Sequence, residues 1–121
     1  MYDHIGLKVK DLEASVRFYQ CALAALGHVL ASSDESVAGL GPAAEPALWL
    51  YRAKRSSGNP GVHIAFRAPN RSAVDRFHAS GLEAGGRDNG RPGVRSEYSP
   101  MYYAAFLIDP DGNNVEAVCT R

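Results

Sequence analysis

The chain is poor in the features that mark secreted, membrane-spanning and nucleic-acid-binding proteins. It has two cysteines among 121 residues, Cys21 and Cys119, which lie far apart and show no Cys-x-x-Cys spacing. We interpret both as free thiols of a reducing cytoplasm. The 13 basic and 13 acidic side chains cancel, so we expect neither nucleic acid nor a membrane surface as a partner.

Long apolar runs are also lacking, which argues against a membrane-spanning helix. The segment Met1-Tyr-Asp-His leads straight into a patterned stretch, so we expect no signal peptide. The length suits one compact domain, which we place at residues 1–121.

What the chain does have is regular periodicity in its first half. Residues 2–10 alternate apolar and polar side chains, which predicts a strand with one apolar face. Residues 12–26 repeat apolar side chains at helical spacing, which predicts a helix that Asp11 caps and Gly27 ends. Three more strands are expected, at residues 28–33, 36–41 and 47–51.

The second half starts the same pattern again after a polar break at residues 54–61. We expect a strand at 62–67 and a helix at 71–84, capped by Asn70 and ended by Gly85 and Gly86. The glycine-, arginine- and proline-rich residues 86–100 predict at most a short strand. The last two strands, from 101 to 108 and from 114 to 119, are expected on either side of the turn Asp109-Pro-Asp-Gly112.

The two halves are an internal repeat. A shift of 59 residues places His4 on His63, Phe18 on Phe77 and Gly27 on Gly86 without a gap. The sequence therefore predicts an α+β fold of two tandem βαβββ modules, the first over about 1–53 and the second over about 61–121, joined by a linker at 54–60. With a helix on the outer face of each sheet, the paired modules would leave a concave face uncovered.

Three polar side chains stand out on the predicted strands. The alternation turns His4 and His63 away from the helices, and Glu116 alternates in the same way against Val115 and Ala117. Two neutral imidazoles and one carboxylate are a standard site for a divalent metal if the modules bring them together. The alternatives are a solvent-facing Glu116 on a half-exposed strand and histidines with ordinary hydrogen-bond partners.

Three stretches resemble the vicinal oxygen chelate superfamily, which includes glyoxalase I, the fosfomycin- and bleomycin-resistance proteins and type I extradiol dioxygenases. They are Asp3-His-Ile-Gly-Leu-Lys-Val-Lys-Asp-Leu-Glu-Ala-Ser-Val-Arg-Phe-Tyr19, Val62-His-Ile-Ala-Phe66 and Tyr102-Tyr-Ala-Ala-Phe-Leu-Ile-Asp-Pro-Asp-Gly-Asn-Asn-Val-Glu116.

The resemblance implies paired βαβββ modules that form a cupped mixed sheet around a divalent metal ion (Fe, Mn, Zn or Ni). It implies that His4, His63 and Glu116 match the family's ligand positions. It also implies a homodimer, with the cup formed either within one chain or across two.

The implied function is that of a small metal-dependent lyase, transferase or dioxygenase. Such an enzyme chelates neighbouring oxygens of a small-molecule substrate and stabilises an enolate or oxyanion. The alternative is a non-catalytic protein of the bleomycin-resistance kind that sequesters a small molecule. Metal binding by the purified protein would discriminate between the two.

Further candidate residues lie around the metal ligands. We expect Tyr102 and Tyr98 as catalytic acid or base, and Trp49, Tyr103 and Arg95 as substrate-binding residues. Because Tyr102 and Tyr103 are neighbours on a strand, only one of them can line the cup. Trp49 aligns with Glu116, where glyoxalase I usually has a fourth ligand, and this argues against glyoxalase I activity.

Overall fold

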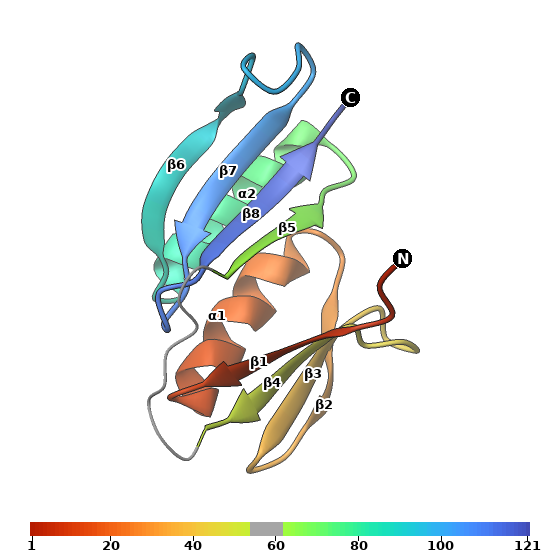
Figure 1. The fold of residues 1–121 in the computed structure, drawn as a ribbon, viewed down its shortest axis with the longest axis vertical. Helices are drawn as coiled ribbons and strands as arrows, with labels where there is room; N and C mark the ends of the chain where they lie inside the picture. Colours follow the sequence, from red (N-terminus) through yellow and green to blue (C-terminus); the bar gives the residue numbers. More distant parts are fainter. Residues whose placement is uncertain (54–61) are drawn as a thin grey trace.

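The computed structural model of the chain describes residues 1–53 and 62–121, and each half folds as one βαβββ unit (Figure 1). The predicted linker at 54–60 lies outside the described residues. The elements, in chain order, are β1 (Ile5–Val9), α1 (Leu12–Ala24), β2 (Val29–Ser33), β3 (Val37–Gly41), β4 (Leu48–Arg52), β5 (His63–Arg67), α2 (Arg71–Glu83), β6 (Arg87–Val94), β7 (Tyr103–Ile108) and β8 (Asn114–Cys119).

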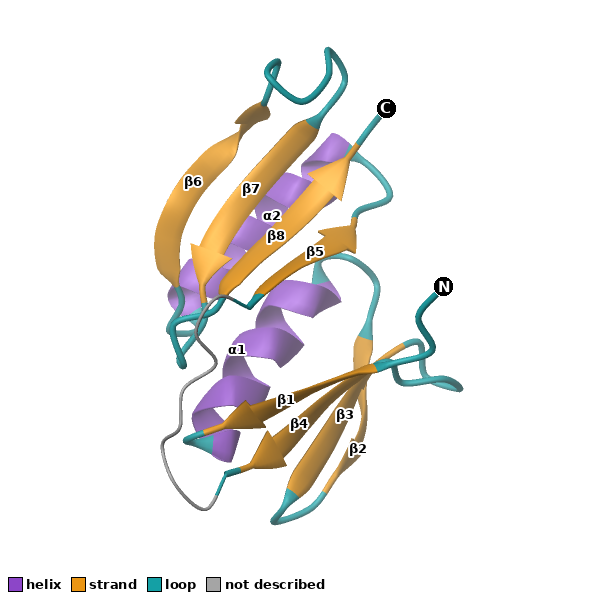
Figure 2. Cartoon of the chain, viewed as in Figure 1, coloured by secondary structure: helices purple, strands orange, loops and turns teal. Residues whose placement is uncertain are grey.

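Each unit builds its own four-stranded mixed sheet. Sheet 1 has the order β1-β4-β3-β2 and sheet 2 the equivalent order β5-β8-β7-β6. The pairs β1–β4 and β5–β8 are parallel and the others antiparallel. One helix covers one face of each sheet, α1 on sheet 1 and α2 on sheet 2 (Figure 2). The predicted α+β fold of two βαβββ modules is confirmed.

The helix ends follow the predicted signals. The Asp11 carboxylate accepts a hydrogen bond from the Ala14 amide at 3.1 Å, and the Asn70 side chain accepts one from the Ala73 amide at 2.8 Å. Both bonds satisfy a first-turn N–H that has no partner inside the helix. Gly27, with φ +91°, ends the segment after α1, and Gly85, with φ +101°, does so after α2, as expected of a left-handed helix stop.

Strand β6 is longer than the sequence predicts. It has eight residues, where the composition indicated at most a short strand. Its pairing with β7 shifts register between Asp88 and Gly90 and again between Gly90 and Gly93. Because β6 is the edge strand of sheet 2, Pro92 can lie in it with its missing N–H on the unpaired side.

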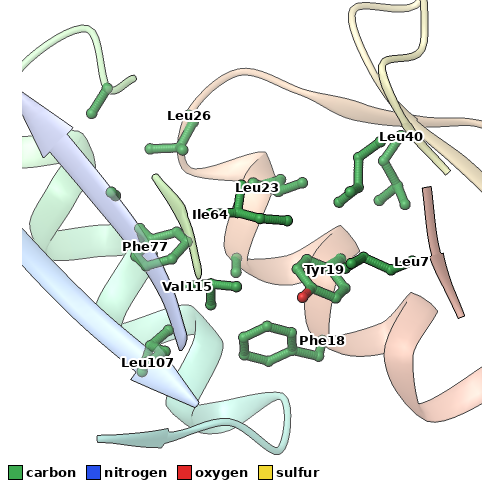
Figure 3. Close-up of a cluster of buried hydrophobic side chains, with 14 of the residues drawn as sticks. Leu7, Phe18, Tyr19, Leu23, Leu26, Leu40, Ile64, Phe77, Leu107 and Val115 are labelled. Atoms are coloured by element: carbon green, nitrogen blue, oxygen red, sulfur yellow. The ribbon is translucent and has the colours of Figure 1, made fainter. Parts of the chain in front are cut away.

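The two modules share one hydrophobic core (Figure 3). Phe18 on α1 is fully buried and reaches into the second module. A methyl group on Gly86 would lie 2.4 Å from a ring carbon of Phe18, and one on Gly81 would lie 3.3 Å from the same carbon. Both glycines therefore make room for an aromatic ring from the other module.

The turn before β8 is also attached to the first module. The buried Tyr19 hydroxyl on α1 donates to the Asp109 carboxylate at 2.5 Å. The neighbouring Asp111 carboxylate accepts from the Lys10 amide at 2.9 Å and from the Ser15 hydroxyl at 3.3 Å. Two side chains of α1 and the backbone amide of Lys10 thus hold the turn that leads into β8.

Two further features of the structure concern the helix lengths and the cysteines. Neither helix in the described part of the chain has the length and apolar character needed to cross a bilayer. Cys21 is exposed and Cys119 is buried, and both are free thiols.

Candidate functional site

The candidate site lies on the face of sheet 2 that points away from α2, called here the open face of sheet 2. Alternation along β7 and β8 decides which side chains reach it. The hydroxyl of Tyr103 bonds Asp75 on α2, so even-numbered residues of β7 point to the opposite face. In the β7–β8 register Phe106 pairs with Glu116. The open face therefore carries Phe106 and Glu116, with His63 beside them on β5.

Glu116 and His63 are in direct contact. Nε2 of His63 lies 3.0 Å from Oε1 of Glu116, and the Glu116 side chain is only 4% exposed. Nδ1 of His63 lies 3.0 Å from the backbone carbonyl of Asn114, which can only accept, so Nδ1 carries a proton. Nε2 then faces a carboxylate oxygen at 3.0 Å, a position where a cation could contact both atoms.

Tyr102 completes the environment of Glu116. Its hydroxyl donates to the other carboxylate oxygen, Oε2, at 2.5 Å. Burial, reinforced by this bond and by the Glu116 charge, raises the pKa of Tyr102 to about 12. The phenol is therefore protonated at neutral pH and acts as a donor. The ring of Tyr98, a residue that is 63% exposed, packs edge-on against the Tyr102 ring with centroids 5.0 Å apart.

Arg95 lies on the same side of the sheet, and Tyr103 does not. The Arg95 guanidinium is 5.4 Å from the centroid of the Phe106 ring, which in turn stacks near the His63 ring at 6.3 Å. Tyr103 instead donates to Asp75 at 2.6 Å on the helix side. Of the two neighbouring tyrosines, the structure brings Tyr102 alone to the open face.

His4 lies apart from His63 and Glu116. It is exposed, and its Nδ1 is 2.7 Å from Asp3. It lines an apolar cavity of about 190 Å³ between the start of β1 and strand β5, with Ile64 and Phe66 also in the lining. Within the described residues of one chain, no three His, Cys, Asp or Glu side chains form a group that could hold a metal.

Trp49 occupies the place in module 1 that Glu116 occupies in module 2. Trp49 pairs with Gly6 on β1 and Glu116 with Ala65 on β5, and these two partners are themselves 59 residues apart. The alignment made from the sequence therefore holds in the strand register. A methyl group on Gly39 would lie 2.6 Å from a ring carbon of Trp49, so the indole lies flat against β3.

Comparison with known proteins identifies the family. The sequence model of the Glyoxalase/Bleomycin resistance protein/Dioxygenase superfamily matches residues 2–117. The chain belongs to this superfamily. None of the curated proteins matches it in sequence.

Solved structures show the same superfamily fold. A glyoxalase/bleomycin resistance protein from Albidiferax ferrireducens T118 is 29% identical, with a TM-score of 0.85 and 98% of each chain covered. A putative glyoxalase from Bacillus halodurans is 24% identical, with a TM-score of 0.74, covering 98% of this chain and 94% of its own. A family enzyme from Burkholderia phytofirmans PsJN is 17% identical, with a TM-score of 0.74 and 98% of each chain covered.

Superfamily members typically bind a divalent metal, and the chemistry of His63 and Glu116 fits one. The ring nitrogen that faces Glu116 is the one left without a proton when Nδ1 donates to a carbonyl, which is the common arrangement of a metal-binding histidine. Glu116 is buried, and in the described part of the chain His63 is its only ion-pair partner. A cation between the two groups would satisfy both.

Two contributors to this candidate site are not predicted by the sequence. The sequence predicts a strand from 101 to 108 but not the face that Phe106 takes, because this face depends on how β7 pairs with β8. Asn114 acts through its backbone carbonyl, and a carbonyl leaves no signal in residue type. The alternation within the predicted strand 101–108 is the one sequence signal that relates the face of Phe106 to that of Tyr102.

Proposed function

We propose that this protein is a small metal-dependent enzyme whose site is centred on Glu116 and His63. The observation that carries the proposal is the contact of a buried carboxylate with a histidine nitrogen whose partner nitrogen is fixed by a carbonyl. A divalent ion bound there would accept two neighbouring oxygens of a small-molecule substrate and stabilise negative charge on them. Substrates that bind a metal through two oxygens, as in glyoxalases and dioxygenases, fit this chemistry. The reaction would be that of a lyase, a transferase or a dioxygenase.

The surrounding residues have distinct proposed roles. Tyr102, held protonated, donates to Glu116 and is the candidate group for delivering a proton. Tyr98 packs against it at the solvent side. Trp49 lies over Gly39 as an aromatic wall, and Arg95 lies over Phe106. Tyr103 is directed to α2, so we assign it no contact with substrate.

We propose that the third ligand, His4, comes from a second copy of the chain. One chain brings together two of the three expected ligands, while His4 is exposed and lies elsewhere. A C2 homodimer would use the same surface twice and create two equivalent sites. We place this dimer in the cytoplasm, in keeping with the two free thiols.

The experiment is metal analysis of protein dialysed against Zn²⁺, Mn²⁺, Ni²⁺ or Fe²⁺. Glu116→Gln removes the charge with little change of shape, and we expect metal affinity to fall by about 100-fold or more, because even outer-shell changes cost about 10- to 100-fold. Glu45→Gln, at an exposed loop position, makes the same charge change and serves as the control. Equal affinity in both variants would refute the ligand assignment.

A mixture of His4→Ala and Glu116→Gln chains tests the shared site. Neither variant alone has an intact site, but a heterodimer has one, so an equimolar mixture should recover about a quarter of the metal sites. No recovery after subunit exchange would show that the chains do not share ligands.

The alternative, a metal-free binding protein of the bleomycin-resistance kind, is favoured by the separation of His4 from the other ligands within one chain. It predicts that none of the four ions binds or raises the melting temperature of the wild-type protein.

A further inference from the structure

Arg95 is the least explained charged residue near the site. Arg95 takes part in none of the ion pairs observed among the described residues. Arg52, by contrast, pairs with Glu13 across the surface of module 1. Arg95 is half-buried and lies on the open face, where its charge is not neutralised by a carboxylate.

The Arg95 side chain is held in a fixed place. Its Nη2 donates to the backbone carbonyl of Arg91 at 2.6 Å, and its guanidinium lies over the Phe106 ring. A methyl group on Gly90 would lie 3.2 Å from Nη2, and one on Gly93 would lie 3.1 Å from Nη1. The two glycines of Gly90-Arg-Pro-Gly93 thus keep both flanks of the guanidinium clear.

The backbone of Arg95 organises the rest of the candidate site. Its N–H donates to the Tyr102 carbonyl at 2.7 Å, and its carbonyl accepts from the Tyr98 and Ser99 amides at 3.0 and 3.3 Å. The position of the guanidinium is therefore linked to those of Tyr98 and Tyr102. A solvated surface arginine needs none of these constraints, because a mobile side chain loses less conformational entropy.

We propose that Arg95 forms an anion subsite, and that the ligand of this protein is a small molecule carrying an oxyanion, either a carboxylate or a phosphonate or phosphate group. One of the five guanidinium N–H donors is used by Arg91, and the remaining donors suit two oxygens of such a group. The subsite is separated from His63 by the Phe106 ring, so the oxyanion lies at the far end of the ligand from the chelating oxygens. That this anion subsite binds the substrate of the enzyme rests on the proposed function.

The test is a titration of metal-free protein, kept in a chelator, with inorganic phosphate and separately with acetate at constant ionic strength. Backbone amide NMR signals of Gly93 and Tyr102 report binding. We expect saturable shifts in the wild type and about tenfold or greater weakening in Arg95→Gln, because a charge-assisted bidentate contact is lost. Arg91→Gln removes the same charge from an exposed neighbour and should leave the affinity unchanged.

A second variant keeps the positive charge of Arg95 and changes the space around its guanidinium. Gly93→Ala places a methyl group against Nη1, so we expect weaker phosphate binding with the guanidinium still present. If Arg95→Gln does not fold, Gly93→Ala still tests whether the guanidinium of Arg95 binds the anion. Shifts with phosphate alone assign a phosphonate or phosphate ligand, and shifts with both anions assign a carboxylate-tolerant subsite.

Either of two results would overturn the proposal: no saturable shift with phosphate or acetate, or equal loss in the Arg95→Gln and Arg91→Gln proteins. Because no metal is present, the result is independent of the metal experiment. Absent metal binding together with Arg95-dependent phosphate binding would refute the proposed enzyme and leave the anion subsite in place.

Discussion

The hydrogen bond between Tyr19 and Asp109 provides a sharp test of how the two modules are joined. The Tyr19 side chain is 1% exposed and Asp109 is 3% exposed, so this bond to a carboxylate is shielded from water. Tyr19→Phe removes the hydroxyl and leaves Asp109 with the three donors of its own turn, from Asp111 and Asn113. A hydrogen bond to a charged group contributes about 1.5–3 kcal/mol, and we expect a loss of that size in the free energy of unfolding.

Urea denaturation measures the loss, with the fluorescence of the single tryptophan, Trp49, as probe. For a slope of about 1–3 kcal/mol/M, the midpoint should fall by about 1 M with the slope unchanged. Tyr103→Phe is the matched control, since it removes a hydroxyl bonded to Asp75 at 2.6 Å on the surface. We expect it to cost at most about 1 kcal/mol, because water can replace the lost donor at this exposed carboxylate. Equal losses in the two variants would refute the idea that burial makes the Tyr19 bond the stronger one.

The same bond predicts a dependence on alkaline pH. Burial, and then the Asp109 charge, raise the pKa of the Tyr19 hydroxyl well above its ordinary value. Above pH ~10 the unfolded chain loses this proton while the folded chain keeps it, so the stability that Tyr19 contributes decreases as pH rises. The difference in unfolding free energy between wild type and Tyr19→Phe should therefore be constant below pH ~9 and narrow above pH ~10. A difference that widens with pH would show that the sign is wrong.

Two further predictions concern the aromatic side chains of the site. Gly39→Ala should displace the Trp49 ring, shift its emission spectrum and cost about 1–3 kcal/mol through overpacking; an unchanged spectrum would mean that the ring does not lie on β3. Tyr102→Phe should remove one phenol that titrates near pH 12 in a spectrophotometric titration, and should lower metal affinity by about 10-fold through loss of the donor to Glu116. A missing phenol that titrates near pH 10 would contradict the pKa shift of Tyr102.

Much of the fold could be predicted because its signals are local. The caps at Asp11 and Asn70 and the helix stops at Gly27 and Gly85 involve neighbours in sequence, and all four were found. Strand β6 was underestimated because glycine and proline weaken a strand in general, and only its edge position removes that objection.

The relative position of the modules lies outside local reasoning. The sequence predicts Gly86 only as part of a helix stop, yet its missing side chain also makes room for the Phe18 ring of the other module. The period of each strand predicts which face His4 and His63 occupy, but not the distance between two separate sheets. Pseudosymmetry therefore aligns three predicted ligands that, within the described residues, one chain does not bring together.

The two modules differ at equivalent positions, and the difference limits which side chains could be ligands of a metal. Module 2 has Glu116 beside Phe106, while module 1 has Trp49 beside Gly39. The indole N–H of Trp49 can only donate a hydrogen bond, so this side chain cannot be a ligand. Its ring also fills the space above Gly39, which leaves no room there for a longer acidic side chain from β3. Trp49 therefore adds no fourth ligand to the proposed three, and an ion with four or more positions would keep one for substrate oxygens at this place. Trp49→Glu tests this step: it should add a ligand and raise metal affinity if sheet 1 of one chain faces Glu116 of another, and an unchanged affinity would show that it does not.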